Sequence, residues 1–267
     1  MQRTCPPLTS LNLENNVHFL TGILIGDEGA VVIAGRLPEL ASLNLVGNGV
    51  GDMGAVSVAS HLTNLTKLDL GRTGISPEGL AALTEGLPNL TSLSLDCIHV
   101  DNEGAAAIAA HLPNLTDLNL NFNAVGDAGS AALAEGLSKL TRLDLCCDAG
   151  DEGAAAIATH LPNINTLLLS ECGISDEGAG AIGARLRNLS ILDLSGNDIT
   201  DKGLQGATGV LTKVADVRAL VPPAAECHCR EYLGSRETRH RPSGEVARSV
   251  APTAALVLSV TIAGAMR

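Results

Sequence analysis

A leucine pair of the form Leu-x-Leu recurs along most of the sequence at a nearly constant spacing. Every step between successive pairs is 25 residues, except one step of 24 residues. A fixed period of roughly 20 to 50 residues is the signature of stacked structural repeats, because one short unit cannot bury its apolar face alone. The chain is therefore predicted to form a solenoid, which grows by adding units and needs no second core. The first residues of the pairs are Leu43, Leu68, Leu93, Leu118, Leu143, Leu167 and Leu192, and Val217 continues the series.

Each unit predicts one short strand followed by one helix. In a strand, the two leucines of the pair lie on one face and the residue between them lies on the other. The helical part follows a period of 3.6 residues, as in Ala105, Ile108, Ala109 and Leu112, which form one apolar stripe. Strand and helix of a unit are thus expected to bury their apolar faces against each other.

The helix starts are marked by capping residues. Proline suits the first position of a helix, so Ser76 before Pro77 is the predicted N-cap. Asp101, Ser175 and Thr200 take the same place in other units. Acidic residues follow in the first turn, where the helix dipole favours negative charge, and this accounts for much of the acidity of the chain.

The unit consensus, LxxLxLxxNxI followed by GAxAIAxHLPNL, resembles the leucine-rich repeat family, in particular its ribonuclease-inhibitor-like class. The Gly-Asp-Glu-Gly-Ala helix start also looks like the GALA-type repeats of secreted bacterial effectors. The resemblance extends from Leu8 to about Leu220. It implies an α/β right-handed horseshoe, with a parallel β-sheet on the concave face and helices on the convex face. The expected organisation is an N-terminal lead (1–10), a repeat domain (11–221) and an irregular or disordered tail (222–267).

The family pattern places an asparagine three residues after the second leucine, where its amide bonds the turning backbone between neighbouring units. Thr and Cys are tolerated there in the ribonuclease-inhibitor-like class, whereas Ile98 has no hydrogen bond to offer, so a looser turn is expected at that unit. The residues at this place are Asn16, Asn48, Thr73, Ile98, Asn123, Asp148, Cys172 and Asn197.

Charge and cysteine usage restrict the partners and the compartment. The net charge is −12, and 25 of the 29 acidic residues lie within residues 1–221, which disfavours nucleic-acid binding and favours a protein partner with a basic or mixed surface. Seven cysteines form no regular disulfide framework, so reduced thiols are predicted. With no secretory signal visible, the predicted location is cytoplasmic. A secreted bacterial effector stays open as an alternative.

No motif for catalysis, a cofactor or a metal was found. His61, His111 and His160 lie two units apart, at roughly 10 Å, which is too far for shared metal coordination, so they are interpreted as helix-end residues. The Cys227-His228-Cys229 segment lacks a second half at zinc-finger distance. No P-loop or nucleophile elbow is present, so the chain is predicted not to be an enzyme and to need no cofactor.

The apolar run from Ala254 to Met266 has 13 residues, fewer than the roughly 20 needed to span a bilayer. A membrane-tethered adaptor that uses this run is therefore a secondary hypothesis, and membrane association is not expected.

The remaining candidate is the concave face, where the residues between paired leucines are mostly polar. A polar, acidic strip with one aromatic residue is typical of a protein-binding surface, so the chain is predicted to be a non-catalytic interaction scaffold. The alternatives are a small-GTPase regulator acting through Arg72, or the recognition module of a ubiquitin ligase or an immune-type receptor. The oligomeric state stays open. The predicted protein-binding residues are Lys67, Asp69, Asp96, Asp117, Asn119, Phe122, Arg142, Asp144, Glu171 and Asp193.

Overall fold

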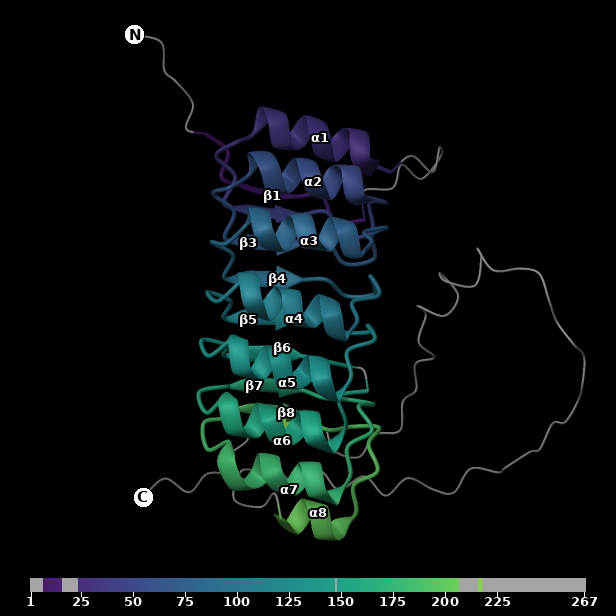
Figure 1. The fold of residues 1–267 in the computed structure, drawn as a ribbon, viewed down its shortest axis with the longest axis vertical. Helices are drawn as coiled ribbons and strands as arrows, with labels where there is room; N and C mark the ends of the chain where they lie inside the picture. Colours follow the sequence, from purple (N-terminus) through teal and green to yellow (C-terminus); the bar gives the residue numbers. More distant parts are fainter. Residues whose placement is uncertain (1–6, 16–23, 147, 207–215, 218–267) are drawn as a thin grey trace, which may run out of the picture. The chain divides into compact units, whose positions relative to one another are not determined.

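The computed structural model describes residues 7–15, 24–146, 148–206 and 216–217 (Figure 1). The chain divides into two units, residues 1–229 and 230–267, and every described residue belongs to the first. The predicted Cys227-His228-Cys229 segment and the apolar run from Ala254 to Met266 lie outside the described residues.

Strands and helices alternate along the first unit. The strands are β1 (Ser10–Asn12), β2 (Ser42–Asn44), β3 (Lys67–Asp69), β4 (Ser92–Ser94), β5 (Asp117–Asn119), β6 (Arg142–Asp144), β7 (Thr166–Leu168), β8 (Ile191–Asp193) and β9 (Asp216–Val217). The helices are α1 (Gly26–Arg36), α2 (Asp52–His61), α3 (Pro77–Gly86), α4 (Asn102–His111), α5 (Asp127–Gly136), α6 (Gly150–His160), α7 (Asp176–Arg185) and α8 (Asp201–Gly206).

All nine strands form one parallel sheet in sequence order, and the helices stack in the same order in a second layer (Figure 1). The register is that of the leucine period: Leu68 pairs with Leu93, and Leu93 pairs with Leu118. Val217 continues the register opposite Leu192. The predicted solenoid with a strand face and a helix face is therefore confirmed.

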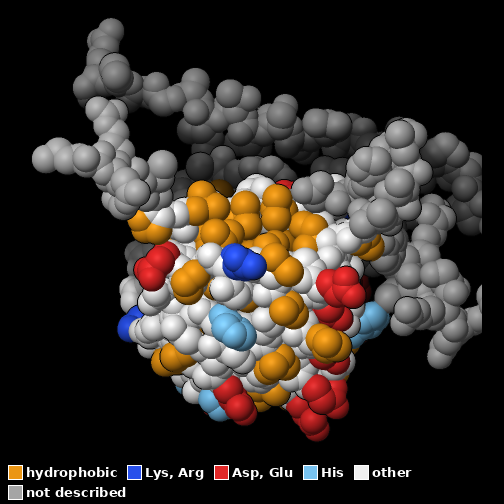
Figure 2. Space-filling model, turned by 90° about the horizontal axis from the view of Figure 1, so that it is seen from above, with side chains coloured by type: hydrophobic (Ala, Val, Ile, Leu, Met, Phe, Trp, Pro, Cys, Tyr) orange, Lys and Arg blue, Asp and Glu red, His pale blue; other side chains and the backbone are white. Residues whose placement is uncertain are grey.

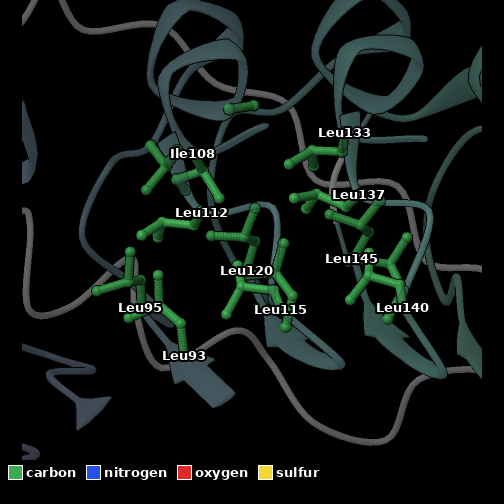
Figure 3. Packing of buried hydrophobic residues seen from close by; sticks show 14 of the residues in the cluster. Leu93, Leu95, Ile108, Leu112, Leu115, Leu120, Leu133, Leu137, Leu140 and Leu145 are labelled. Atoms are coloured by element: carbon green, nitrogen blue, oxygen red, sulfur yellow. The ribbon is translucent and has the colours of Figure 1, made fainter. Parts of the chain in front are cut away.

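The core lies between the two layers. Paired leucines such as Leu118 and Leu120 are fully buried. Ile108 of α4 and its C-cap residue Leu112 are also fully buried and lie on the helix side of Leu120 (Figure 3). Because each unit shares its core with the next, the apolar cluster runs without a break from α1 to β8.

The predicted N-caps are confirmed. The Ser76 side chain accepts the N–H of Glu78, and Asp101 accepts the N–H of Gly104. Ser175 accepts the N–H of Glu177. Thr200 does the same for Lys202, at 3.3 Å.

Carboxylates in the first turn also cap the helix of the following repeat, a role that the sequence analysis did not foresee. Asp27 of α1 accepts the N–H groups of Gly51 and Gly54 before and in α2, at 2.7 and 2.8 Å. Asp52 accepts the N–H and the hydroxyl of Ser76, both at 2.8 Å. Asn102, Asp127, Asp151 and Asp176 make equivalent bonds to the next helix.

The asparagine position links neighbouring units as the family pattern implies. The Asn123 amide donates to the Leu95 carbonyl of the preceding repeat at 2.8 Å, and its oxygen accepts the N–H groups of Ile98 and Val100. Cys172 substitutes through its thiol, which donates to the Leu145 carbonyl.

The end of the solenoid formed by β1 and α1 carries a patch of hydrophobic side chains beside charged ones (Figure 2). Leu11 and Leu13 of β1 are only partly buried, whereas their equivalents Leu43 and Leu45 are buried. Val32 of α1 is 61% exposed. Among the described residues, only 7–9 precede β1, and they form no helix.

One prediction about the cysteines is wrong. Cys97 is disulfide-bonded, so the seven thiols are not all reduced. Irregular spacing of cysteines does not exclude a disulfide in a solenoid, because stacking brings residues of different repeats close together. The predicted cytoplasmic location, which rested partly on reduced thiols, stays a prediction.

Candidate protein-binding face

The strand face is the surface made by the β2 to β8 side chains that alternate with the buried leucines. Seven predicted residues lie within these strands: Lys67, Asp69, Asp117, Asn119, Arg142, Asp144 and Asp193. Asp96 follows β4 by two residues, so it continues the alternation on the same face. The parallel register aligns these side chains in rows across the sheet, as in Asp117 opposite Arg142.

Phe122 and Glu171 lie elsewhere, in the turns that follow β5 and β7. Both have left-handed backbone conformations, with φ of 55° and 56°. Phe122 is half-buried and Glu171 is exposed, so these two side chains border the strand face without belonging to its rows.

The residues between the two leucines of each pair form the middle row of the strand face. Most of the polar residues in this row also have a structural role. The side-chain oxygens of Asn44, Asp69, Asn119 and Asp193 each accept the N–H of the residue two positions later, at 2.9 to 3.2 Å. These local bonds turn the backbone at the end of each strand. The middle row therefore cannot be attributed to binding alone.

Asp144 departs from this pattern. Its carboxylate lies 3.5 Å from the Arg142 guanidinium, and the same guanidinium lies 3.5 Å from the Asp117 carboxylate. The Asp144 side chain is only 13% exposed, whereas those of Arg142 and Asp117 are 40% and 45% exposed. One partly exposed arginine thus serves two aspartates, one of which is nearly buried.

The electrostatics of this cluster are unfavourable for a charged Asp144. Burial raises the pKa of Asp144 to about 6; the Arg142 charge opposes this shift, while Asp193, Asp117 and Asp96 add to it. Burial also raises the pKa of Asp69, against the hydrogen bonds from Gly71 and Ser94 that lower it. Carboxylates whose pKa is raised by burial are frequent at functional sites, although structural networks of charges also produce them.

Arg72, the residue named for the GTPase alternative, is paired. Its Nε lies 3.3 Å from Asp96 Oδ2, and its side chain is 58% exposed. An arginine that stabilises a transferred phosphoryl group would have to leave this pair, so the geometry does not favour the alternative.

Asn121 is a residue of the strand face that the sequence analysis missed. Within the described residues, its buried side-chain oxygen has no hydrogen-bond partner, although its backbone N–H donates to Asn119. The signal was available, because Asn121 lies one period after Asp96. It therefore belongs to the same row as that aspartate.

The three periodic histidines end helices α2, α4 and α6 and are exposed. His61 and His111 place Nδ1 at 2.9 and 3.0 Å from backbone carbonyls one turn earlier. This geometry fits the predicted helix-end role.

None of the helices described is long and apolar enough to cross a bilayer.

Comparison with known proteins supports the repeat architecture. A family model described as "Leucine Rich repeat" matches residues 39–59, 61–83, 86–109, 111–134, 160–183 and 185–206, which together make up just over half of the chain. No curated protein sequence matches. Among solved structures, an internalin from Listeria monocytogenes is similar over 81% of this chain, with 22% sequence identity and a TM-score of 0.54. The chain covers 62% of that protein, less than two thirds of its length, and at this identity the likeness shows the fold alone.

Proposed function

The chain belongs to the leucine-rich repeat family, and we propose that it is a non-catalytic scaffold that binds a partner protein through its strand face. Proteins of this architecture typically act by protein–protein interaction, and a stack of parallel strands offers an extended surface for it. The proposed contact residues are the predicted ones within or beside the strands, with Phe122 and Glu171 at the border.

The observation that carries the proposal is the aspartate cluster around Asp144. Asp96, Asp117 and Asp193 act on this nearly buried carboxylate, and within the described part of the chain Arg142 is the cation that opposes them. A lysine or arginine side chain from a partner would add a second cation and favour the charged form of Asp144. A partner with a basic or mixed surface therefore complements this face, whereas a nucleic acid would be repelled.

A pull-down with matched charge variants tests the proposal. One variant of the full chain carries Asp96→Asn, Asp117→Asn and Asp144→Asn, which remove three charges from the strand face. The control removes the same number of charges from exposed positions on α3, α4 and α5, through Glu85→Gln, Glu103→Gln and Glu135→Gln.

Captured proteins are quantified from lysate of the source cells. The proposal expects at least one protein that the control retains and that the strand-face variant loses by about tenfold or more, because two or three charge-assisted contacts are removed. Equal loss in both variants would indicate a nonspecific effect of net charge. Equal retention would show that the strand face does not bind, and either result contradicts the proposal.

A further inference from the structure

The helix starts of neighbouring repeats are joined by carboxylate or amide caps at every described junction except the one between α3 and α4. Pro77 occupies the place that Asp27, Asp52 and Asn102 occupy in other helices, and its side chain has no acceptor. Helix α4 begins instead with a cap of its own, in which Asp101 accepts the Gly104 N–H at 2.9 Å. The helix side of this junction therefore lacks the bonds that tie the other helix starts together.

The turn that precedes α4 lacks its backward link as well. Asn48, Cys172 and Asn197 each donate from the side chain to a carbonyl of the preceding repeat. Ile98 is apolar, and the Thr73 hydroxyl of the preceding repeat bonds the Leu70 carbonyl of its own unit at 2.6 Å. Of the junctions described, only this one lacks both the first-turn cap and the backward bond at the asparagine position; the disulfide-bonded Cys97 lies in the same turn.

The turn is also strained, and it is held from the other side. His99 has a φ of 65°, a left-handed conformation that glycine adopts at the equivalent positions Gly49 and Gly173. This region is disfavoured for residues with a Cβ atom, because the Cβ approaches the following carbonyl oxygen. The Asn123 oxygen accepts the N–H groups of Ile98 and Val100, so the turn is bonded to the following repeat.

Among the described residues, bonds across the junction are found at the sheet and at the helix C-termini. Strands β3 and β4 pair in full register, and Arg72 pairs with Asp96. At the far end of the helices, the Asn114 amide donates to the Pro88 carbonyl at 3.3 Å.

At the helix N-termini, a shallow groove separates the two repeats. Its lining includes Pro77, Leu80, Ile98 and His99. Helices α3 and α4 pack less closely than any other neighbouring helices from α1 to α8.

We infer that the junction between α3 and α4 is a hinge. The helix N-termini separate there while the sheet stays continuous, so the repeats up to α3 and the repeats from β4 onward move as two blocks. Because the strand face crosses the hinge line between β3 and β4, this motion changes the curvature that a bound partner meets.

Hydrogen exchange in the full-length, non-reduced chain tests the local part of the inference. The amides at residues 99–105 should exchange about tenfold faster than those at residues 124–130, after correction for intrinsic rates, since Gly126 and Gly129 are capped by Asn102.

A repair variant, Pro77→Asp with Asp101→Ser, reproduces the arrangement of Asp52 with Ser76. It should slow exchange at 99–105 to the rate at 124–130. The converse variant, Asp52→Pro, removes the cap on α3 and should speed exchange at 76–80 by a similar factor.

Pulsed EPR tests whether the blocks move. Spin labels at Val56 and Ala131 span three junctions that include the proposed hinge, and labels at Ala106 and Gly180 span three that do not. The first pair should give the broader distance distribution, and the repair variant should narrow it. Equal exchange at 99–105 and 124–130 in the natural chain would overturn the hinge, and so would equal EPR widths, because local fraying alone does not move a block.

Discussion

Replacing Asp144 by asparagine should stabilise the protein at neutral pH. The carboxylate is nearly buried in the middle of the strand face, and three aspartates oppose its ionisation against one arginine. Asparagine keeps the shape and removes the charge. The gain should therefore depend on pH in a way that identifies the group.

The sign follows from the two states of the carboxyl group. Its pKa is 3.8 in an exposed setting and about 6 in the folded chain, so the folded chain binds the proton more tightly. The stability that Asp144 contributes is fully present below pH 4 and is lost as the pH rises to about 6. This difference in pKa corresponds to about 3 kcal/mol. The pKa of about 6 already includes the attraction to Arg142, so the expected gain is up to about 3 kcal/mol.

Urea unfolding of the natural chain and Asp144→Asn at pH 4, 6 and 8 measures this effect. The difference between the two proteins should be near zero at pH 4 and should reach its full value by pH 8. The variant Glu103→Gln, at an exposed site on α4, should show no such trend. A constant difference between Asp144→Asn and the natural chain, or destabilisation at pH 8, would refute the assignment of an unfavourable charge to Asp144.

Three further substitutions test the packing and the caps by urea unfolding. Ser76→Ala should lower the free energy of unfolding by about 1 to 2 kcal/mol, because the hydroxyl caps α3 and bonds Asp52 of the preceding repeat. The control Ser60→Ala, on the exposed side of α2, should lower it by under about 0.5 kcal/mol. Equal losses in the two variants would contradict the capping role. Asn123→Ala should lower the free energy of unfolding by about 2 to 4 kcal/mol, because two backbone N–H groups and two carbonyls lose their hydrogen-bond partner. A loss of stability no larger than that of Asn114→Ala would contradict the linking role. Leu118→Ala should cost about 3 to 5 kcal/mol through the cavity left at a fully buried site, and a cost under about 1 kcal/mol would show that the core does not extend through β5.

The sequence predicted the fold because its signal repeats. The leucine period gave the register of every strand pair from β2 to β9, since stacking identical units leaves one way to align them. The caps at Ser76 and Ser175 were also predictable, because a cap is a bond between residues two or three positions apart.

What failed to emerge from the sequence depends on contacts between repeats. Acidic residues of the first turn were assigned to the dipole of their own helix, but Asp52 bonds the next helix, a distinction that requires knowing how closely two helix starts approach. The recurrence of aspartate at the position of Asp52 in most repeats was the available signal. Most of the predicted contact residues lie within or beside the strands, but periodicity could not reveal that Asp69 turns its own strand end or that Asp144 is nearly buried.

The first-turn caps make the described helix starts from α2 onward, except that of α4, depend on the repeat before them. The repeats therefore depend on a constant distance from one first-turn cap to the next, in addition to the strand and the helix of each repeat. Insertion or deletion of one whole repeat would place the first-turn side chain of another repeat beside the next helix start. Any other change in length would move that side chain away from the N–H groups that it caps. We therefore expect homologous chains to differ in the number of repeats but not by insertions or deletions of a fraction of a repeat.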